Sequence, residues 1–202
     1  RASPRVPGKM LPLLKALRPH QWIKNAAVLA ALIFAYGDQN QDLSQEQVLL
    51  NLLAVACFCF ISSAIYLIND TKDIELDRQH PTKRFRPIAA GQVGVKTALL
   101  SSALLTVLSL GTGFWLNHYF GLVILGYYVM QLGYTQGLKR MAFIDVTIIA
   151  LGFVLRALGG ALAIRVTISP WLLLCTMLLA LFLGLCKRRH EKVVLGELND
   201  QA

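Results

Sequence analysis

Long blocks of apolar residues, separated by short polar segments, make up most of the chain. A membrane-spanning helix needs about 20 predominantly apolar residues, within a range of about 17–25. Six blocks reach or approach this length, at residues 22–36, 48–68, 98–116, 120–133, 146–164 and 170–186. The first and fourth are short, so we expect them to draw on flanking residues or to lie partly inside a bundle. The pattern predicts an all-α fold: a polytopic membrane bundle with six spans, formed by residues 1–202 as a single domain.

The composition agrees with a membrane protein. Hydrophobic residues make up 55% of the chain and charged residues only 15%, whereas soluble domains carry about 25% charged residues. The net charge of +9 would suit a nucleic-acid partner, but in a membrane protein excess Lys and Arg usually mark topology and anionic headgroups. We therefore expect no nucleic-acid partner. The four cysteines lie in apolar blocks without zinc-site or disulfide spacing, and we interpret them as buried apolar residues.

The positive charges are distributed unevenly between the two ends of the predicted spans. Of the 20 Lys and Arg residues, all but Arg156 and Arg165 lie before the first block, at its start, or after the second, fourth and sixth blocks. The segment 37–47 carries Asp38, Asp42 and Glu46 and no cation. By the positive-inside rule, the N-terminus and the segment after the second block face the cytoplasm.

The most polar segment, residues 69–91, directly follows the second block. No helix breaker lies between Val48 and Pro81. We therefore predict one continuous helix from residue 48 to Gln79, ending at His80 because the residue before a proline disfavours helical geometry. At about 1.5 Å per residue this helix would be about 48 Å long, against a hydrocarbon core of about 30 Å. Its polar end must project beyond the bilayer core.

Four oxygen-bearing side chains share one face of that projecting end. At 100° per residue they fall within an arc of about 100°, and they are Asn69, Asp70, Asp73 and Asp77. Carboxylates on one face repel each other unless a cation holds them. Oxygen ligands favour Mg²⁺, which typically takes one or two carboxylates plus substrate phosphates. We expect two ions, one near Asp70 and Asp73 and one near Asp73 and Asp77.

Cationic side chains follow the carboxylates immediately. Lys83, Arg84 and Arg86 are residues of the types that bind phosphate. Carboxylates for metal followed by cations for phosphate are the pattern of a diphosphate site. The alternative is a solvated helix end with ordinary intrahelical salt bridges.

At these residues the chain resembles the UbiA superfamily of intramembrane prenyltransferases, and most closely its decaprenyl-phosphate phosphoribosyltransferase branch. The motif NDxxDxxxD is at residues 69–77, and HPxKxxRPIAxG follows at 80–91. Similar blocks are LRPxQWxKN at 17–25, GFVLRA at 152–157 and SPW at 169–171. The resemblance covers most of the chain, from about residue 17 to residue 191.

The resemblance implies an enzyme with a UbiA-type fold in the plasma membrane of a bacterium. Such an enzyme transfers 5-phosphoribose from phosphoribosyl pyrophosphate to a polyprenyl (decaprenyl) phosphate, with Mg²⁺, for the synthesis of cell-wall arabinose donors. Residues 69–97 would form its cytoplasmic catalytic loop. The catalytic carboxylates would be Asp70, Asp73 and Asp77, which would bind the metal together with Asn69.

Members of this family have about nine helices and a second polar motif after the sixth. This chain has Lys187 and Glu191 at that place and ends at Ala202. We therefore expect six spans of about nine, in a chain that is incomplete at its C-terminus. Lys187 would be a further phosphate-binding residue.

Polar residues elsewhere near the cytoplasmic face have two interpretations each. Tyr134 and Lys139 would hold substrate phosphate, or they anchor the helices at the membrane interface. Lys24 and Arg18, at the entrance of the first block, would contact substrate phosphate or lipid headgroups.

Two further charged residues lie within the fifth block or at its start. Asp145 would join the site or cap the helix. Arg156 lies near the middle of the block, where a charge is costly and usually paired or functional. We expect it to be buried, in a structural or a substrate-facing role.

Two other functions remain open at this point. A UbiA-type aromatic prenyltransferase, which uses a prenyl diphosphate, would share the carboxylate motif but must stabilise an allylic cation. A transporter or other non-catalytic membrane protein would place its polar residues near the midplane, whereas here they gather at one face.

Overall fold

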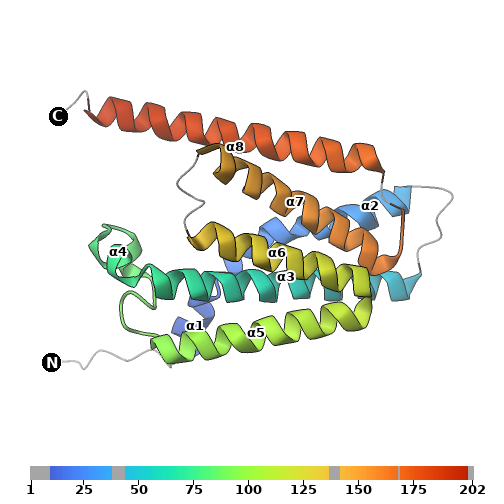
Figure 1. Cartoon of the computed structure of the whole chain (residues 1–202), viewed down its shortest axis with the longest axis horizontal. Coiled ribbons are helices and arrows are strands. Elements are labelled where there is room, and N and C mark those ends of the chain that lie inside the picture. The colour runs from blue at the N-terminus through green and yellow to red at the C-terminus, as the bar shows by residue number, and fades with distance from the viewer. Residues whose placement is uncertain (1–9, 38–43, 137–141, 168, 200–202) are drawn as a thin grey trace.

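The structure, a computed structural model, describes residues 10–37, 44–136, 142–167 and 169–199. Over these ranges the regular structure is helical, without a strand, so the predicted all-α fold is confirmed (Figure 1). In chain order the elements are α1 (Met10–Ala16), the 3₁₀ helix η1 (Pro19–Leu29), α2 (Ala30–Gly37), α3 (Gln45–Lys72), α4 (Ile74–Gln79), the 3₁₀ turn η2 (Lys83–Phe85), α5 (Val95–Leu116), α6 (His118–Gln136), α7 (Ala142–Ile164) and α8 (Pro170–Asn199).

Three helices in the described ranges are long and apolar enough to cross a membrane. They are Gln45–Lys72, Val95–Leu116 and Ile144–Ile164, and Pro170–Cys186 is a shorter apolar stretch within α8. Each of the six predicted blocks lies within a helix or a pair of consecutive helices. The structure therefore supports a membrane bundle, while the count of six spans stays a prediction.

The first block folds differently from the single helix that we predicted. Residues 19–29 form a 3₁₀ helix, and only from Ala30 does the chain become α-helical. This segment packs very closely on α7: a Cβ on Gly160 would lie 2.0 Å from the Val28 carbonyl oxygen. Asn51 of α3 donates from Nδ2 to the carbonyl oxygens of both Val28 (3.4 Å) and Gly160 (3.3 Å). The close contact between η1 and α7 occurs where the chain forms the tighter 3₁₀ helix. The periodicity of the local sequence does not predict such a tertiary contact.

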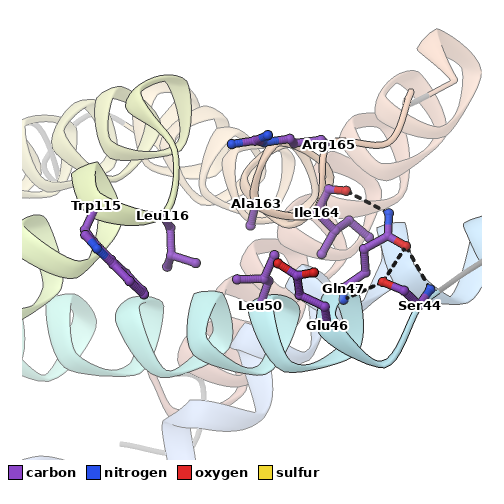
Figure 2. A pocket seen from close by; sticks show the side chains of 9 residues that line it. All are labelled: Ser44, Glu46, Gln47, Leu50, Trp115, Leu116, Ala163, Ile164 and Arg165. Atoms are coloured by element: carbon purple, nitrogen blue, oxygen red, sulfur yellow. Dashed lines mark hydrogen bonds between the residues drawn. The ribbon is translucent and has the colours of Figure 1, made fainter.

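Helix α3 is the centre of the bundle. It begins at a capping box, in which the Gln47 backbone N–H donates to Ser44 Oγ and the Ser44 backbone N–H donates to Gln47 Oε1 (Figure 2). Further along, Phe58 makes edge-on contacts with Phe120 and Tyr127 of α6, with ring centroids 6.1 and 5.5 Å apart. Helices α5, α6 and α7 and the 3₁₀ helix η1 all pack against α3.

Helix α8 lies outermost and packs mainly against α7 (Figure 1). Because α8 is only partly covered by other helices, the expectation that all four cysteines are buried is wrong. Cys57 and Cys59 of α3 are buried as expected, but Cys175 and Cys186 of α8 are exposed.

The predicted continuous helix from residue 48 to Gln79 is wrong in its middle. Helix α3 ends at Lys72, and Asp73, with φ −93° and ψ 12°, separates it from α4. The hydrogen-bond chain nevertheless passes through the junction, since the Asp73 N–H donates to the Asn69 carbonyl oxygen. Both sides of this junction take part in tertiary ion pairs, through Asp70 before it and Asp77 after it. The predicted end of the helix at His80 is confirmed, because that residue is extended.

Candidate active site

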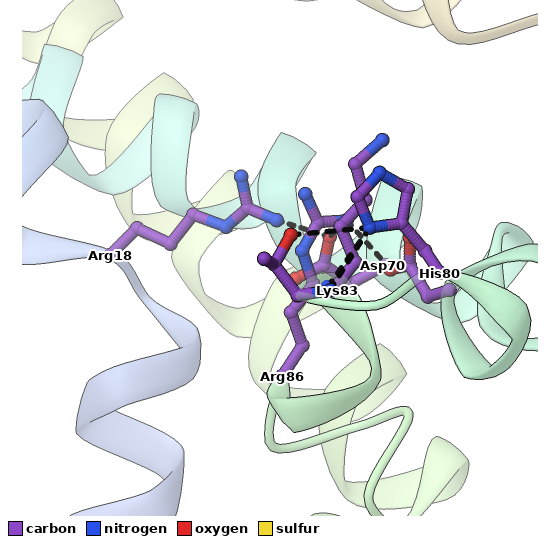
Figure 3. A network of polar contacts seen from close by, with 7 residues as sticks. Arg18, Asp70, His80, Lys83 and Arg86 are labelled. Atoms are coloured by element: carbon purple, nitrogen blue, oxygen red, sulfur yellow. Dashed lines mark hydrogen bonds and ion pairs between the residues drawn. The ribbon is translucent and has the colours of Figure 1, made fainter. Parts of the chain in front are cut away.

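Two buried aspartates at the end of α3 and on α4 are joined by arginine. Asp70 and Asp77 are 2% and 3% exposed. Nη1 of Arg86 donates to Asp70 Oδ1 at 3.3 Å and to Asp77 Oδ2 at 2.6 Å, so one guanidinium bridges both carboxylates (Figure 3). Nη2 of Arg18 donates to the same Asp70 oxygen at 2.5 Å. The cation that holds these acids together in this structure is therefore arginine.

Arg18 reaches this cluster from an unusual backbone conformation. It lies between α1 and η1 with φ 54° and ψ 59°, in the left-handed region. A non-glycine residue there is strained, and a residue before proline normally prefers extended geometry. Its guanidinium also lies 4.9 Å from the centroid of the Tyr66 ring. In this conformation the Arg18 side chain makes both the ion pair with Asp70 and the contact with the Tyr66 ring.

The loop after α4 is held so that Arg86 faces the aspartates. His80 Nδ1 accepts hydrogen bonds from the backbone N–H groups of Thr82 (3.2 Å) and Lys83 (3.3 Å), which fixes the turn. Farther along, Ile88 and Val93 are buried in a small apolar cluster with Ala16, Leu67 and Ala98. The loop is thereby anchored on both sides of Arg86.

The remaining predicted residues of this segment differ in how they are placed. Asn69 and Asp73 are half-buried, and Lys83 and Arg84 are exposed on the loop. Glu75 is exposed and pairs with Arg78 at the surface. Asp70 and Asp77 thus come together, while Lys83 and Arg84 stay outside the buried cluster.

The predicted set of metal ligands is not assembled in this arrangement. Within the described ranges, no three His, Cys, Asp or Glu side chains are placed to hold a metal ion. Arg86 lies between Asp70 and Asp77 and already compensates their charge. The oxygen donors are of the type that Mg²⁺ prefers, but in this arrangement two of the three carboxylates are bound to arginine.

A cavity of about 500 Å³ lies inside the bundle next to this cluster, bordered by η1, α3, α6, α7 and α8. Tyr66, whose ring lies beneath Arg18, is part of its wall and so connects the cavity to the aspartates. Lys24, Ser62 and Gln131 are polar parts of the lining, and Ile149 and Leu183 are apolar parts. Lys24, predicted to contact phosphate, therefore lines the cavity.

Arg156 forms the charged part of this cavity. It is 6% exposed, as expected for a charge in mid-helix. Its Nε donates to Asn25 Oδ1 at 2.8 Å and its Nη2 to the Tyr127 hydroxyl at 2.7 Å, and the guanidinium lies over the Tyr127 and Phe153 rings. These partners are all neutral. In the part of the chain that the structure describes, no carboxylate pairs with Arg156, so its positive charge is buried and uncompensated.

A second ion-pair group joins α6, α7 and α8. The Tyr134 hydroxyl donates to Asp145 Oδ1 at 2.6 Å, and Arg188 donates through Nε and Nη2 to Asp145 Oδ2. Tyr134 lies just beyond the fourth apolar block. Burial raises the pKa of its phenol, and the hydrogen bond to Asp145 raises that pKa further. Tyr134 is therefore a stable hydrogen-bond donor. Asp145 lies in the first turn of α7, which begins at Ala142, and its carboxylate joins three helices.

Sequence reasoning missed Arg188, Asn25 and Tyr127 as parts of these groups. The pairing of Arg188 with Asp145 spans 43 residues and that of Arg156 with Asn25 spans 131. Asn25 does lie within the block LRPxQWxKN, which was the available signal. Lys139 lies outside the described residues, and so do the side chains of Lys187 and Glu191.

Comparisons with known proteins agree on one family. The model of the UbiA prenyltransferase family matches residues 24–188. Decaprenyl-phosphate phosphoribosyltransferases from Mycolicibacterium smegmatis and Corynebacterium glutamicum are each 43% identical to the chain, over 89% of its length and 56% and 54% of theirs. A solved UbiA homolog from Archaeoglobus fulgidus, bound to DMAPP and Mg²⁺, is 25% identical with a TM-score of 0.69, over 84% of this chain and 60% of that one. The chain thus spans a little over half the length of these relatives.

Proposed function

The chain belongs to the UbiA prenyltransferase family, and from this premise we propose that its protein transfers 5-phosphoribose from phosphoribosyl pyrophosphate to a polyprenyl phosphate. The activity named for the 43% identical relatives supports this choice of reaction. So do the cationic side chains of the site: Arg18 and Arg86 bind the buried aspartates, and Lys24 and Arg156 line the cavity. Both substrates of this reaction are anions.

One observation favours a phosphate-bearing occupant of the cavity. Arg156 is buried beside the cavity with neutral partners alone. A buried cation is costly unless an anion compensates it, and an arginine cannot lose its proton. An apolar prenyl chain in this cavity would leave the charge uncompensated, whereas a phosphate-bearing occupant would not.

The proposed reaction needs little proton transfer. An oxygen of the lipid phosphate attacks the anomeric carbon of the ribose and forms a new C–O bond. The bond from that carbon to the pyrophosphate oxygen breaks, and pyrophosphate leaves with the electron pair. The lipid phosphate is already anionic and needs no strong base. Guanidinium groups near the leaving group stabilise the charge that develops on it.

We also propose that the reaction uses a divalent metal ion. The bound Mg²⁺ of the Archaeoglobus fulgidus homolog supports this, and Asp70, Asp73 and Asp77 carry suitable oxygen donors. In the arrangement described, two of these carboxylates are bound to arginine, so we assign the ion no step.

The test uses membranes that contain the full-length protein, labelled phosphoribosyl pyrophosphate and decaprenyl phosphate. We expect a lipid-soluble product that carries the ribose label and the release of pyrophosphate. In a parallel reaction the protein receives a prenyl diphosphate and an aromatic acid. Product only in the parallel reaction would replace our proposal by an aromatic prenyltransferase. Product in neither reaction would leave a non-catalytic or transport role in its place.

A further inference from the structure

A second cavity, of about 430 Å³, lies at the other end of the bundle (Figure 2). It is bordered by the first turns of α3, the end of α5 and the end of α7. Glu46, which lines it, lies about 36 Å along α3 from Asp70 at about 1.5 Å per residue. The base of the cavity is apolar, with Leu50, Leu116 and Ile164. The reaction proposed above assigns nothing to it.

Two opposite charges line this cavity. Glu46 comes from the α3 side and Arg165 from the α7 side (Figure 2). Both side chains are exposed. Over the ranges that the structure describes, neither forms an ion pair, with the other or with a third residue. The cavity therefore offers one cationic and one anionic group to a ligand.

The backbone of Arg165 adopts a strained conformation. Its φ is 56°, and Val166 N–H donates to the Ala161 carbonyl oxygen at 3.1 Å, which is the hydrogen bond of a Schellman helix end. Glycine is the favoured residue at this position because it has no Cβ to clash. An arginine here carries a conformational cost, and such outliers often mark functional positions.

A hydrogen bond connects the two elements that carry these charges. Gln47, part of the capping box with Ser44, donates from Nε2 to the Ile164 carbonyl oxygen at 3.1 Å. This hydrogen bond ties the start of α3 to the end of α7, one residue from each charged side chain. Glu46 and Arg165 thereby lie on elements that this hydrogen bond joins.

An apolar track leads away from the cavity along α5. Trp115 lines the cavity, and Leu108 and Leu104 lie within about 20° of it around the helix at 100° per residue. All three are exposed. The distance from residue 115 to 104 is about 16 Å, close to half of a hydrocarbon core of about 30 Å. Tryptophan is itself typical of the membrane interface.

We propose that this cavity binds a phospholipid whose headgroup carries a primary amine, as phosphoethanolamine does. The lipid phosphate pairs with Arg165, the ammonium group donates hydrogen bonds to Glu46, and an acyl chain follows Trp115, Leu108 and Leu104. An anionic headgroup would be repelled by Glu46. A choline headgroup has no N–H to donate to that carboxylate. The proposal is independent of the reaction proposed for the other end of the bundle.

The experiment measures lipid binding by native mass spectrometry of the detergent-purified protein. Phosphatidylethanolamine, phosphatidylcholine and phosphatidylglycerol with identical acyl chains are titrated separately, and soluble glycerophosphoethanolamine forms a fourth arm. We expect phosphatidylethanolamine to bind at least about tenfold more tightly than the other lipids, the factor that one charge-assisted hydrogen bond provides. Equal binding of the three lipids would overturn the proposal. Binding of the soluble headgroup as tight as that of the lipid would overturn the assignment to a membrane lipid.

Two variants locate the site. Glu46→Gln should lose the preference for phosphatidylethanolamine over phosphatidylglycerol, because it removes both the ammonium partner and the repulsion. Arg165→Gly should weaken the binding of phosphatidylethanolamine about tenfold or more. The melting temperature of this variant without lipid should not fall, since glycine suits the left-handed backbone. Lys96→Ala, which removes a charge at the opposite end, should bind as the wild type does. Unchanged lipid binding by both cavity variants would refute the site.

Discussion

At the scale of single residues, the candidate active site is organised by arginine. Arg86 holds two buried carboxylates with one nitrogen, and Arg18 shares one of them. Truncating one partner of a buried ion pair leaves an uncompensated charge, which costs about 3–5 kcal/mol. Arg86 is 25% exposed, so its removal belongs near the lower end of that range.

We expect Arg86→Gln to lower the stability of the protein, because Asp77 loses the ion pair that the structure gives it. Arg84→Gln is the matched control: it removes the same kind of side chain from the same loop, where Arg84 is exposed and lies over the Phe85 ring. In thermal unfolding in detergent, the melting temperature should fall clearly for Arg86→Gln and change little for Arg84→Gln. An equal effect at both positions would mean that the bridge does not stabilise the fold.

Asp73→Asn tests the proposed metal ion. Asp73 lies at the junction of α3 and α4, between the other two aspartates of the motif. Replacing its carboxylate by an amide keeps the shape but removes a ligand of the type that Mg²⁺ prefers. Nearly all phosphoribosyl transfer should be lost, as it should be for the wild type in EDTA. Glu75→Gln, on the opposite side, should remain active. Full turnover of the wild type in EDTA would exclude the ion.

The sequence predicted which residues gather at this site better than it predicted their partners. Helical spacing placed Asp70 and Asp77 on one face, and they do converge. It did not predict that Arg86 would bridge them, nor that Arg18, 52 residues before Asp70, would reach it. Spacing along one helix describes local neighbours, whereas these pairs depend on how separate elements fold together.

At the scale of helices, the apolar pattern located the helices that contain the six predicted blocks, but it did not predict α1 or the internal geometry of the helices. Residues 19–29 are 3₁₀ and α3 breaks at Asp73. Both departures occur where tertiary contacts compete with the helix. In the first case the contact is the close approach of Val28 to Gly160, which the polar bridge of Asn51 reinforces.

Gly160→Ala should destabilise the bundle. The added Cβ would lie 2.0 Å from the Val28 carbonyl oxygen, so backbone would have to move. Overpacking of this kind typically costs about 1–3 kcal/mol. Gly126→Ala on α6 is the control, because a Cβ there meets no atom within 4 Å. The melting temperature in detergent should fall for position 160 and hold for position 126. If both variants unfold alike, the contact between η1 and α7 does not limit stability.

At the scale of the whole molecule, the two ends of the bundle differ in chemistry. One end carries the aspartate–arginine cluster, with the cavity lined by Arg156 next to it inside the bundle, and the other end carries the smaller cavity with Glu46 and Arg165. The charge distribution predicts that the aspartate end faces the cytoplasm. These two ends lie far apart along α3, so labelling from one side of the membrane distinguishes them.

Single cysteines at positions 83 and 42 decide the orientation, after Cys57, Cys59, Cys175 and Cys186 have been replaced. A membrane-impermeant maleimide should label Asp42→Cys in intact cells, and Lys83→Cys only after the membrane is opened. The reason is electrostatic: moving 18 of 20 cationic side chains to the outer face would oppose the bias that sets membrane topology. Labelling of position 83 in intact cells would reverse the orientation. It would also count against the proposed reaction, because the loop beside Arg86 would then be separated by the membrane from a multiply charged donor in the cytoplasm, which cannot cross a hydrocarbon core unaided.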